Sequence, residues 1–223
     1  MLDDADWRRG VLGAHLKLAA VPLQMPDNPD EFAKWAIDQD KYLRDLASRC
    51  GGGLPPETWL HEFDQWVREG HITAHKLGQL SGSSSVQTSL ALIRGRAIGD
   101  FESQWIQGFY NDLRDGRYIG TDGAVNDSQI YYRMRLYLGK MRGTAGYGFV
   151  DASSSTDSFD WEMTGLEDHC ADCPILAAGG PYTKDTLYTT PGACDTPCLG
   201  YCKCILRRHS DGATSAMPFE FAS

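Results

Sequence analysis

The sequence predicts a mainly α-helical protein, in which a helical domain precedes a small irregular C-terminal module that is stapled by zinc. Three observations lead to this fold class. Apolar residues recur every three or four positions along most of the first part of the chain, no strand hairpin pattern competes with them, and six of the seven cysteines lie within residues 170–204. We therefore expect a helical domain over 1–145, a linker over 146–160, a cysteine-rich zinc module over 161–208 and an exposed tail over 209–223.

Four segments carry the helical pattern. The first, 30–49, follows a start signal at Asn28-Pro29-Asp30, and the second, 54–80, begins with a Leu-Pro-Pro start. The third, 86–116, gives the cleanest amphipathic signal in the chain, and the fourth spans about 126–142. The stripe of the third segment consists of Leu90, Ile93, Ala97, Phe101, Trp105, Phe109 and Leu113.

Composition and charge exclude several classes of protein. With 42% hydrophobic and 23% charged residues over 223 positions, the chain is long enough to bury a sizeable core and is not disordered throughout. It contains no apolar run of the roughly 18 residues that a membrane span needs, and its acidic N-terminus disfavours export by a secretory signal. A net charge of -9 and a pI near 5.0 argue against a general nucleic-acid binder.

Two stretches are predicted to lie outside compact structure. Residues 143–158 are rich in Gly and Ser, which is typical of a linker. The end of the chain carries Phe219 and Phe221 among small and polar residues. It forms either an exposed tail that anchors on a partner or a frayed end.

The spacing of the clustered cysteines is typical of a metal site. Cys170 and Cys173 form a C-x2-C half-site, and Cys198, Cys202 and Cys204 supply a second half after a loop of Gly, Pro and Thr. Thiolates at about 2.3 Å satisfy a tetrahedral Zn²⁺. A loop so poor in apolar residues also needs the folding free energy that metal binding supplies. We expect zinc on these five cysteines, and disulfides are the alternative.

The cysteines outnumber the ligands of one four-coordinate ion. Either some of them are spare, or His169 and a subset of the cysteines compete for the same ion. Cys194 is the weakest candidate because it lies inside the Pro-Gly loop. Cys50 stands alone, which favours a buried or idle thiol over a nucleophile.

The donor set favours a structural ion over a catalytic one. An all-thiolate site is closed, whereas a catalytic zinc keeps an open position beside a group that moves protons. The nearby acidic residues could support the ligands or merely be solvated, and the chain lacks the H-x-E and P-C-x-x-C elements of a deaminase. For His71 and His75, which share a helix face, a surface or capping role is favoured over metal binding. The acidic residues are Glu167, Asp168 and Asp172.

A basic cluster stands out on the fourth segment of this acidic chain. Arg133, Arg135, Lys140 and Arg142 lie close together among three tyrosines. The cluster is either a solvated helix face or a contact for an acidic protein surface or for packaged DNA. The second interpretation rests on the enrichment of Arg and aromatic residues at interfaces.

A series of motifs runs through the cysteine-rich region. Between Trp161 and Leu206 the chain reads W-x7-H-C-x2-C-P, then L-A-A-G-G-P-Y, then T-P-G and C-x3-C-K-C-I-L. This region resembles the C-terminal part of phage minor head proteins of the Mu F type. Upstream, Arg133 and Tyr137 match the R-x3-Y helix of these proteins, so the resemblance covers about residues 85–207.

The resemblance has consequences for individual cysteines. It implies that Cys170, Cys173, Cys202 and Cys204 correspond to the two cysteine pairs of the family. Cys198 stands near the position where many relatives have His. The chain departs from the family at Tyr201, which replaces an Asn, and at Cys194, which is extra.

The resemblance also implies a function. It indicates a structural virion protein of a tailed bacteriophage, assembled in the host cytoplasm, present in few copies and without catalytic activity. The expected partners are portal, capsid or tail proteins and further copies of the chain, with packaged DNA as a weaker candidate and no membrane. The alternatives are a zinc-dependent hydrolase or nucleic-acid deaminase, and a nucleic-acid-binding zinc-knuckle regulator.

Overall fold

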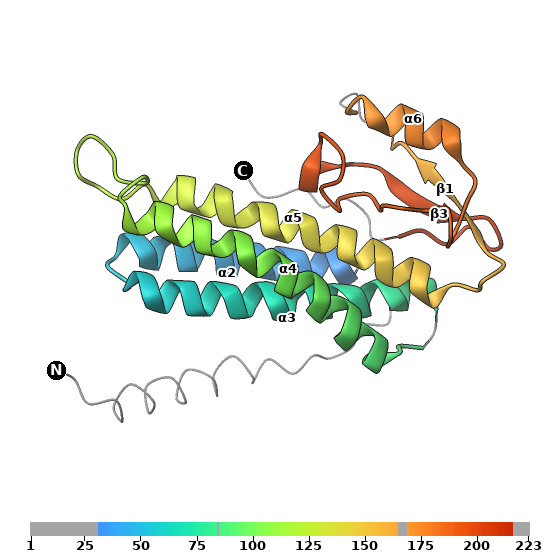
Figure 1. Cartoon of the computed structure of the whole chain (residues 1–223), viewed down its shortest axis with the longest axis horizontal. Coiled ribbons are helices and arrows are strands. Elements are labelled where there is room, and N and C mark those ends of the chain that lie inside the picture. Colours follow the sequence, from blue (N-terminus) through green and yellow to red (C-terminus); the bar gives the residue numbers. More distant parts are fainter. Residues whose placement is uncertain (1–30, 84, 165–168, 216–223) are drawn as a thin grey trace.

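A computed structural model describes residues 31–83, 85–164 and 169–215. Four long helices form an elongated bundle, and a smaller C-terminal module lies against one end of it (Figure 1). The predicted class, mainly helical with a cysteine-rich C-terminal region, is confirmed. The bundle consists of α2 (Glu31–Gly51), α3 (Pro56–Gly82), α4 (Thr88–Arg114) and α5 (Asp127–Ala152).

The helix starts follow local sequence signals. All four begin within two residues of the predicted starts. α3 has Pro at its first position, where the missing N–H is not needed. At α5, Asn126 Oδ1 accepts a hydrogen bond of 3.0 Å from the Gln129 N–H and so caps the helix.

α3 is the central helix of the bundle. It packs along α5 on one side and along α4 on the other, while α2 packs mainly on α5. Gly78 allows the close approach of α3 to the α5 backbone at Ala145, and Gly95 allows that of α4 to the α3 backbone at Ile72. A Cβ atom at either glycine would collide with the facing backbone, so these positions need glycine for proximity.

Aromatic side chains fill the interior of the bundle. Trp59, Phe63 and Phe109 are fully buried, and the ring centroids of Trp59 and Phe109 lie 4.9 Å apart in an edge-to-face arrangement. Tyr137 of α5 meets Phe63 edge-to-face at 5.2 Å. Such rings dominate the apolar area that a core of this size removes from water.

α4 turns most of its apolar stripe outward. Ile93, Phe101 and Trp105 are 68%, 58% and 56% exposed, and only the C-terminal end of the stripe, at Phe109 and Leu113, reaches the core. The buried face instead carries small residues where α4 crosses α3, because close backbone contact selects the glycine side. The buried residues of α4 are Ala91, Gly95, Gly99, Glu102, Ile106 and Phe109.

α5 continues well past its predicted end at residue 142, up to Ala152. The predicted linker over 146–160 is therefore wrong, since 146–152 are helical and β1 begins at Ser158. The glycines that suggested flexibility are sites of close contact. A Cβ at Gly146 would lie 2.8 Å from the Thr190 Cβ, and one at Gly143 would collide with the backbone at Ala193.

The C-terminal module is more regular than predicted. β1 (Ser158–Glu162) pairs antiparallel with β2 (Tyr182–Thr183) and with β3 (Ile205–Arg208), in the order β2-β1-β3. α6 (Asp172–Gly179) and the short 3₁₀ helix η1 (Leu199–Tyr201) complete it. The module was expected to be irregular, and the structure adds a three-stranded sheet, because strands of two to five residues leave too little alternation to be seen in the sequence.

The module shares its core with the end of α5. Phe149 and Val150 of α5 pack with buried residues from β1, α6 and β3. The rings of Phe149 and Phe159 meet at 5.8 Å. The module thus has no separate hinge from the bundle in the described part of the chain. The other buried members of this core are Phe159, Trp161, Cys173, Leu176, Cys202, Cys204 and Leu206.

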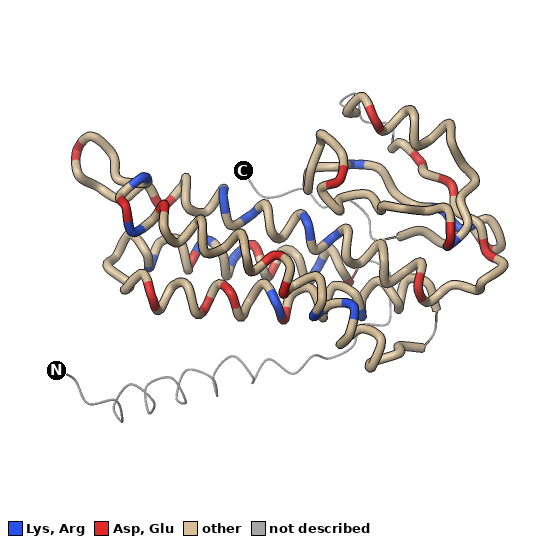
Figure 2. The backbone as a smooth tube through the Cα atoms, in the orientation of Figure 1, with Lys and Arg blue, Asp and Glu red and all other residues tan. Residues whose placement is uncertain are grey.

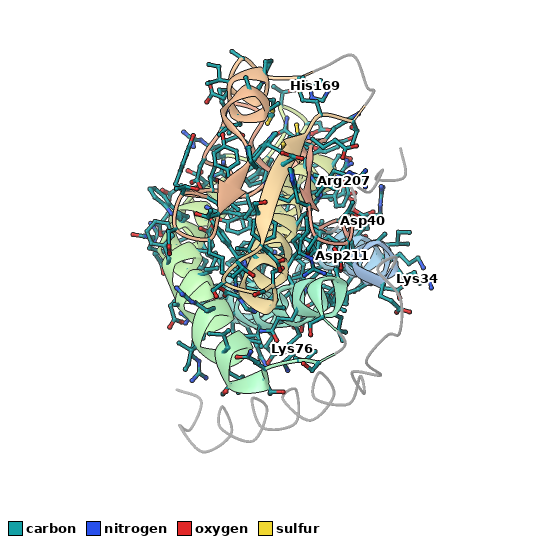
Figure 3. All side chains as sticks on the ribbon, turned by 90° about the vertical axis from the view of Figure 1, so that its right-hand side faces the viewer. Lys34, Asp40, Lys76, His169, Arg207 and Asp211 are labelled. Atoms are coloured by element: carbon teal, nitrogen blue, oxygen red, sulfur yellow. The ribbon has the colours of Figure 1, made fainter. Side chains whose placement is uncertain are left out.

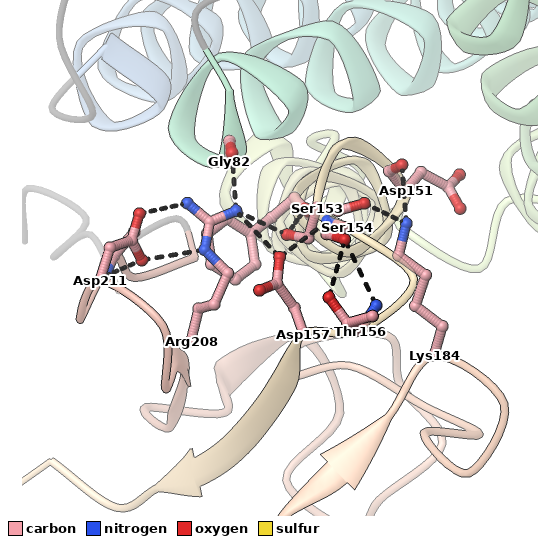
Figure 4. Close-up of polar contacts among 11 residues, drawn as sticks. Gly82, Asp151, Ser153, Ser154, Thr156, Asp157, Lys184, Arg208 and Asp211 are labelled. Atoms are coloured by element: carbon pink, nitrogen blue, oxygen red, sulfur yellow. Dashed lines mark hydrogen bonds and ion pairs between the residues drawn. The ribbon is translucent and has the colours of Figure 1, made fainter.

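Two cations fasten the module to the ends of α3 and α5 (Figure 4). Arg208 donates to Gly82 O at 2.7 Å and to Ser153 Oγ at 2.8 Å, and its remaining nitrogens bind the carboxylate of Asp211. Lys184 donates to Asp151 O at 3.1 Å and to Ser153 O. These bonds satisfy carbonyls that a helix end leaves without intrahelical partners.

The described part of the predicted tail is ordered. Ser215 is buried and its N–H donates to Leu206 O at 2.9 Å, while Thr214 forms a bridge with Arg207. Residues 209–212 are exposed as predicted, whereas 213–215 pack back on β3, so the expectation of an exposed tail is wrong for this last part. Phe219 and Phe221 lie outside the described residues. Among the described helices, none combines the length and the apolarity that crossing a bilayer requires.

Candidate metal centre

Three short segments bring the clustered cysteines together. Cys170 and Cys173 lie at the start of α6, Cys198 precedes η1, and Cys202 and Cys204 lie between η1 and β3. Figure 3 shows sulfur atoms gathered beside His169 at one end of the module. All five sequence-predicted ligands thus reach one region from three parts of the chain.

The sulfur atoms lie at distances that suit a shared ion. Cys170 Sγ is 3.4 Å from Cys173 Sγ, and Cys173 Sγ is 4.0 Å from Cys198 Sγ. These separations are far longer than the roughly 2.05 Å of a disulfide, and all seven cysteines of the chain are unbonded. A tetrahedral zinc with Zn–S bonds of about 2.3 Å places its sulfurs about 3.8 Å apart.

His169 belongs to the same cluster. Its Nδ1 lies 3.6 Å from Cys204 Sγ, and its Nε2 lies 2.8 Å from the backbone oxygen of Thr164. The second contact requires the Nε2–H tautomer, which leaves the Nδ1 lone pair free to face the sulfurs. Metal-binding histidines are usually held in this way by a carbonyl behind the ring.

Two sets of donors converge within 4.8 Å: His169, Cys173 and Cys204 form one, and Cys170, Cys173 and Cys198 form the other. Cys202 belongs to neither set. The neighbouring Cys204 thiol lowers the pKa of Cys202 well below that of an ordinary thiol, and Arg142 and Cys198 act in the same direction. These clustered groups can hold a metal ion.

The other two cysteines lie apart. Cys194 Sγ contacts only Gly192 O, at 3.7 Å, among its described hydrogen-bond partners, and it belongs to neither set of donors. Cys50 packs against the bundle core, where burial raises its pKa. Neither residue lies with the candidate ligands. The sequence spacing had predicted this separation for both.

Arg142 is a component that the sequence did not reveal. Its guanidinium, on α5, is 2% exposed and donates to the backbone oxygens of Cys202 and Cys204. Burial lowers the pKa of Arg142 to about 10, and the neighbouring cysteines act in the opposite direction. It therefore stays positively charged at neutral pH, directly beneath the thiols. Only knowledge that α5 passes under the cysteine segment could have identified it.

Two further polar groups lie near the sulfurs. The buried indole N–H of Trp161 has no hydrogen-bond partner among the described residues. Thr196 Oγ1 lies 3.1 Å from Cys198 Sγ. Donors aimed at sulfur stabilise thiolates, the form in which cysteine binds metal. The chemistry of the surroundings therefore fits a metal on these residues.

The basic cluster of the fourth segment is dispersed in the structure. Lys140 pairs with the buried Glu102 at 2.6 Å, and Arg142 is buried under the cysteines. Arg133 is exposed and lies over the Phe109 ring at 5.8 Å. As Figure 2 shows, Lys and Arg lie among Asp and Glu over the bundle as a whole. The interpretation as one interface face is wrong for Arg142.

His71 and His75 link α3 to α5 in the interior. Both are fully buried, so the predicted surface or capping role is wrong. His71 Nδ1 lies 2.7 Å from Thr144 Oγ1, and burial lowers the pKa of His71 to about 3. His75 Nε2 lies 3.0 Å from an oxygen of Asp151, a partner that the sequence could not place.

The acidic residues considered beside the cysteines divide into two groups. Asp172 lies in the first turn of α6 and belongs to neither set of converging donors. Glu167 and Asp168 lie outside the described residues.

Comparison of the chain with protein-family models, curated proteins and solved structures finds no match. The resemblance to minor head proteins thus rests on the motifs given above.

Proposed function

We propose that the protein is a structural component of a tailed-phage particle, a minor head or portal- and neck-associated protein that acts by docking on its partners. The phage context comes from the motif resemblance of the cysteine-rich region. The docking action comes from one observation, the outward-facing apolar stripe of α4.

The stripe offers an anchoring surface of the kind that protein partners bury. Ile93, Phe101 and Trp105 project large apolar side chains from a helix whose opposite face is already fixed on α3. Contiguous exposed apolar residues mark interaction sites, and aromatic anchors contribute most to binding. A rigid helix also loses little conformational entropy when it is covered.

A cleft beside the stripe extends this surface. It has a volume of about 670 Å³ and lies between α4, α5 and the module. Phe101 belongs to both the stripe and the cleft, while Arg94, Lys184 and Asp185 supply charged groups at its wall. An apolar helix side next to a charged cleft suits a folded protein partner such as a portal or capsid subunit.

In this proposal the metal is zinc and its role is structural. A donor set of Cys and His suits zinc. The ion would hold α6, the loop up to Pro191 and β3 in one arrangement, and Arg142 would fix that arrangement on the bundle. His169 and the clustered cysteines would hold the ion.

The two alternatives make different predictions. A zinc-dependent hydrolase would lose activity with Cys170→Ser while keeping its fold, whereas a structural site would lose the fold of the module. A nucleic-acid-binding regulator would show affinity that falls steeply with salt. The mixed charges of the bundle and the burial of Arg142 favour docking on protein over this second alternative.

The test is incorporation into particles. Mass spectrometry of purified virions of a phage that encodes the chain should find it at a few copies per particle. The variant Phe101→Ser with Trp105→Ser should fold, as judged by its helical circular dichroism, but should be missing from particles. The matched control is Ile37→Ser, at a residue of α2 that is 48% exposed. Absence of the native chain from particles, or equal incorporation of all variants, contradicts the proposal.

A further inference from the structure

The cleft between α4, α5 and the module is open because two of its walls hardly meet. α4 packs along α3 and only marginally against α5, and the chain that follows β2 forms the third wall. The volume of about 670 Å³ lies within the range of about 300–1,000 Å³ that is usual for binding clefts. The cleft is therefore large enough to receive a long side chain of the docking partner.

Part of the cleft wall is apolar and aromatic. Ile98 and Phe101 line it from α4, Tyr147 and Val150 line it from α5, and Leu187 lines it from the module. A long side chain with a charged end can bury its apolar stem against residues of this kind.

The cations around the cleft already have oxygen partners. Lys140 pairs with Glu102 at 2.6 Å. Lys184 donates to Asp151 O at 3.1 Å, and Arg94 lies 3.8 Å from the Asp151 carboxylate. An anionic ligand would have to compete with these oxygens for each cation.

Two carboxylates that line the cleft form no ion pair with any residue that the structure describes. They belong to Asp185 and Asp195, and both residues are exposed. The cleft is lined by four acidic and three basic side chains, which leaves a formal charge of -1. The complementary group for this cleft is therefore a cation.

The chain segment that carries these two carboxylates is fixed on α5. Thr190 Oγ1 donates to Gly143 O at 2.7 Å, and Thr189 Oγ1 donates to Asp195 Oδ2 at 2.8 Å. Lys184, which directly precedes the other acidic residue, is bonded to the end of α5. Carboxylates on a fixed backbone lose little conformational entropy when they bind, so the site is preformed.

We propose that the cleft receives an arginine side chain of the docking partner, with its guanidinium at Asp185 and Asp195 and its stem along Phe101. Arginine suits the cleft better than lysine, because its planar guanidinium binds carboxylates in a fork and stacks on aromatic rings. Arginine is also enriched at protein interfaces. The inference rests on the docking function proposed above and names the partner residue that the cleft beside the stripe recognises.

NMR titration of the isotope-labelled full chain with benzamidine, a planar aromatic amidinium, tests the cleft in the absence of the partner. The amides of Phe101, Tyr147 and Asp195 should shift with benzamidine, and should stay in place with the neutral benzamide and the anionic benzoate. No shift with benzamidine, or an equal shift with benzamide or benzoate, overturns the proposal. Benzylamine, whose ammonium resembles that of lysine, should bind more weakly, and equal binding overturns the preference for arginine.

Two isosteric variants test the carboxylates. Asp185→Asn and Asp195→Asn should each weaken benzamidine binding by about two- to fivefold, the effect of one exposed charge pair. The matched control is Asp38→Asn on α2, where the carboxylate is 72% exposed, and it should bind benzamidine as the native chain does. Native affinity in both cleft variants overturns the assignment of Asp185 and Asp195.

Particle incorporation separates this inference from the docking function. The double variant with Asp185→Asn and Asp195→Asn should enter particles at a lower level than the native chain and Asp38→Asn. Equal incorporation of all three overturns the arginine contact and leaves the docking function intact. Absence of the native chain from particles overturns the docking function itself, and the arginine contact with it.

Discussion

The bundle and the C-terminal module are stabilised in different ways. The bundle buries side chains from four helices around fully enclosed rings such as Trp59, Phe63 and Phe109. The core of the module contains Phe159 and Trp161, and three of its other buried members are cysteines. Burial is worth about 25 cal/mol per Å² of apolar surface, so the bundle can be stable by packing alone. We expect the module to depend on its metal.

The largest expected effect separates the two regions. Cys173→Ser removes a donor common to both sets and should abolish the metal-derived stabilisation of the module, which is on the order of 10 kcal/mol for structural zinc. Limited proteolysis should then cut within 158–215, while the helical circular dichroism of the bundle persists. Cys194→Ser, outside the cluster, is the control and should stay resistant. Loss of the bundle signal in Cys173→Ser would show that the two regions do not differ in this way.

The second effect concerns the contact between the regions. Arg142→Met leaves the carbonyls of Cys202 and Cys204 without donors and removes the buried compensating charge, so it should cost about 3–5 kcal/mol of unfolding free energy. Arg133→Met, at an exposed position of the same helix, should change stability by less than about 1 kcal/mol. Denaturant titration of the metal-loaded proteins measures both values. Equal losses in the two variants would mean that Arg142 does not hold the module.

The third effect compares a glycine at a helix–helix contact inside the bundle with a glycine at the contact between α5 and the module. Gly78→Ala places a methyl group against the α5 backbone inside the bundle, and Gly143→Ala places one against the loop at Ala193. Each should cost about 1–3 kcal/mol by overpacking, but only Gly143→Ala should also weaken metal retention against a chelator. Gly108→Ala meets open space and should be neutral or stabilising by up to about 1 kcal/mol. Equal sensitivity to the chelator in Gly78→Ala and Gly143→Ala would argue that the bundle and the module are not stabilised separately.

The smallest effect is a pH dependence of the bundle. Burial lowers the pKa of His71 to about 3, below the usual value of 6.5. The unfolded chain therefore binds a proton that the folded bundle does not. The stability from this group is present above pH 6.5 and is lost as pH falls toward 3, by about 1 kcal/mol per pH unit. His71→Gln should flatten this slope between pH 6.5 and 5, measured on metal-free protein. His61→Gln, at an exposed position, should keep it.

The sequence predicted some features because they are local. Helix starts are encoded within a few residues, as at Asn126, and C-x2-C spacing brings two sulfurs together without knowledge of the fold. The pairing of β1 with β3 joins segments more than 40 residues apart, and each strand is too short to show a periodic pattern. Long-range contacts of this kind were therefore not visible in the sequence.

The glycines of α5 and the apolar stripe of α4 were recognised in the sequence, but the way they pack was not. Gly143 and Gly146 were interpreted as flexible positions, but the structure uses them where the α5 backbone meets the loop at 190–193. In α4, an amphipathic pattern correctly predicted a helix and did not identify its buried face. The side with Gly95 and Gly99 packs on α3 instead. Composition cannot distinguish a glycine that makes the backbone flexible from a glycine that lets two backbones pack closely.

Hydrogen exchange of the full chain, metal-loaded and then treated with a chelator, tests the contrast between the two regions most directly. Amides of β1, β3 and the cysteine segments should lose protection when the metal is removed, while those of α2 and α3 should keep theirs. Protection that persists throughout the module, or that disappears from both regions together, would contradict the account.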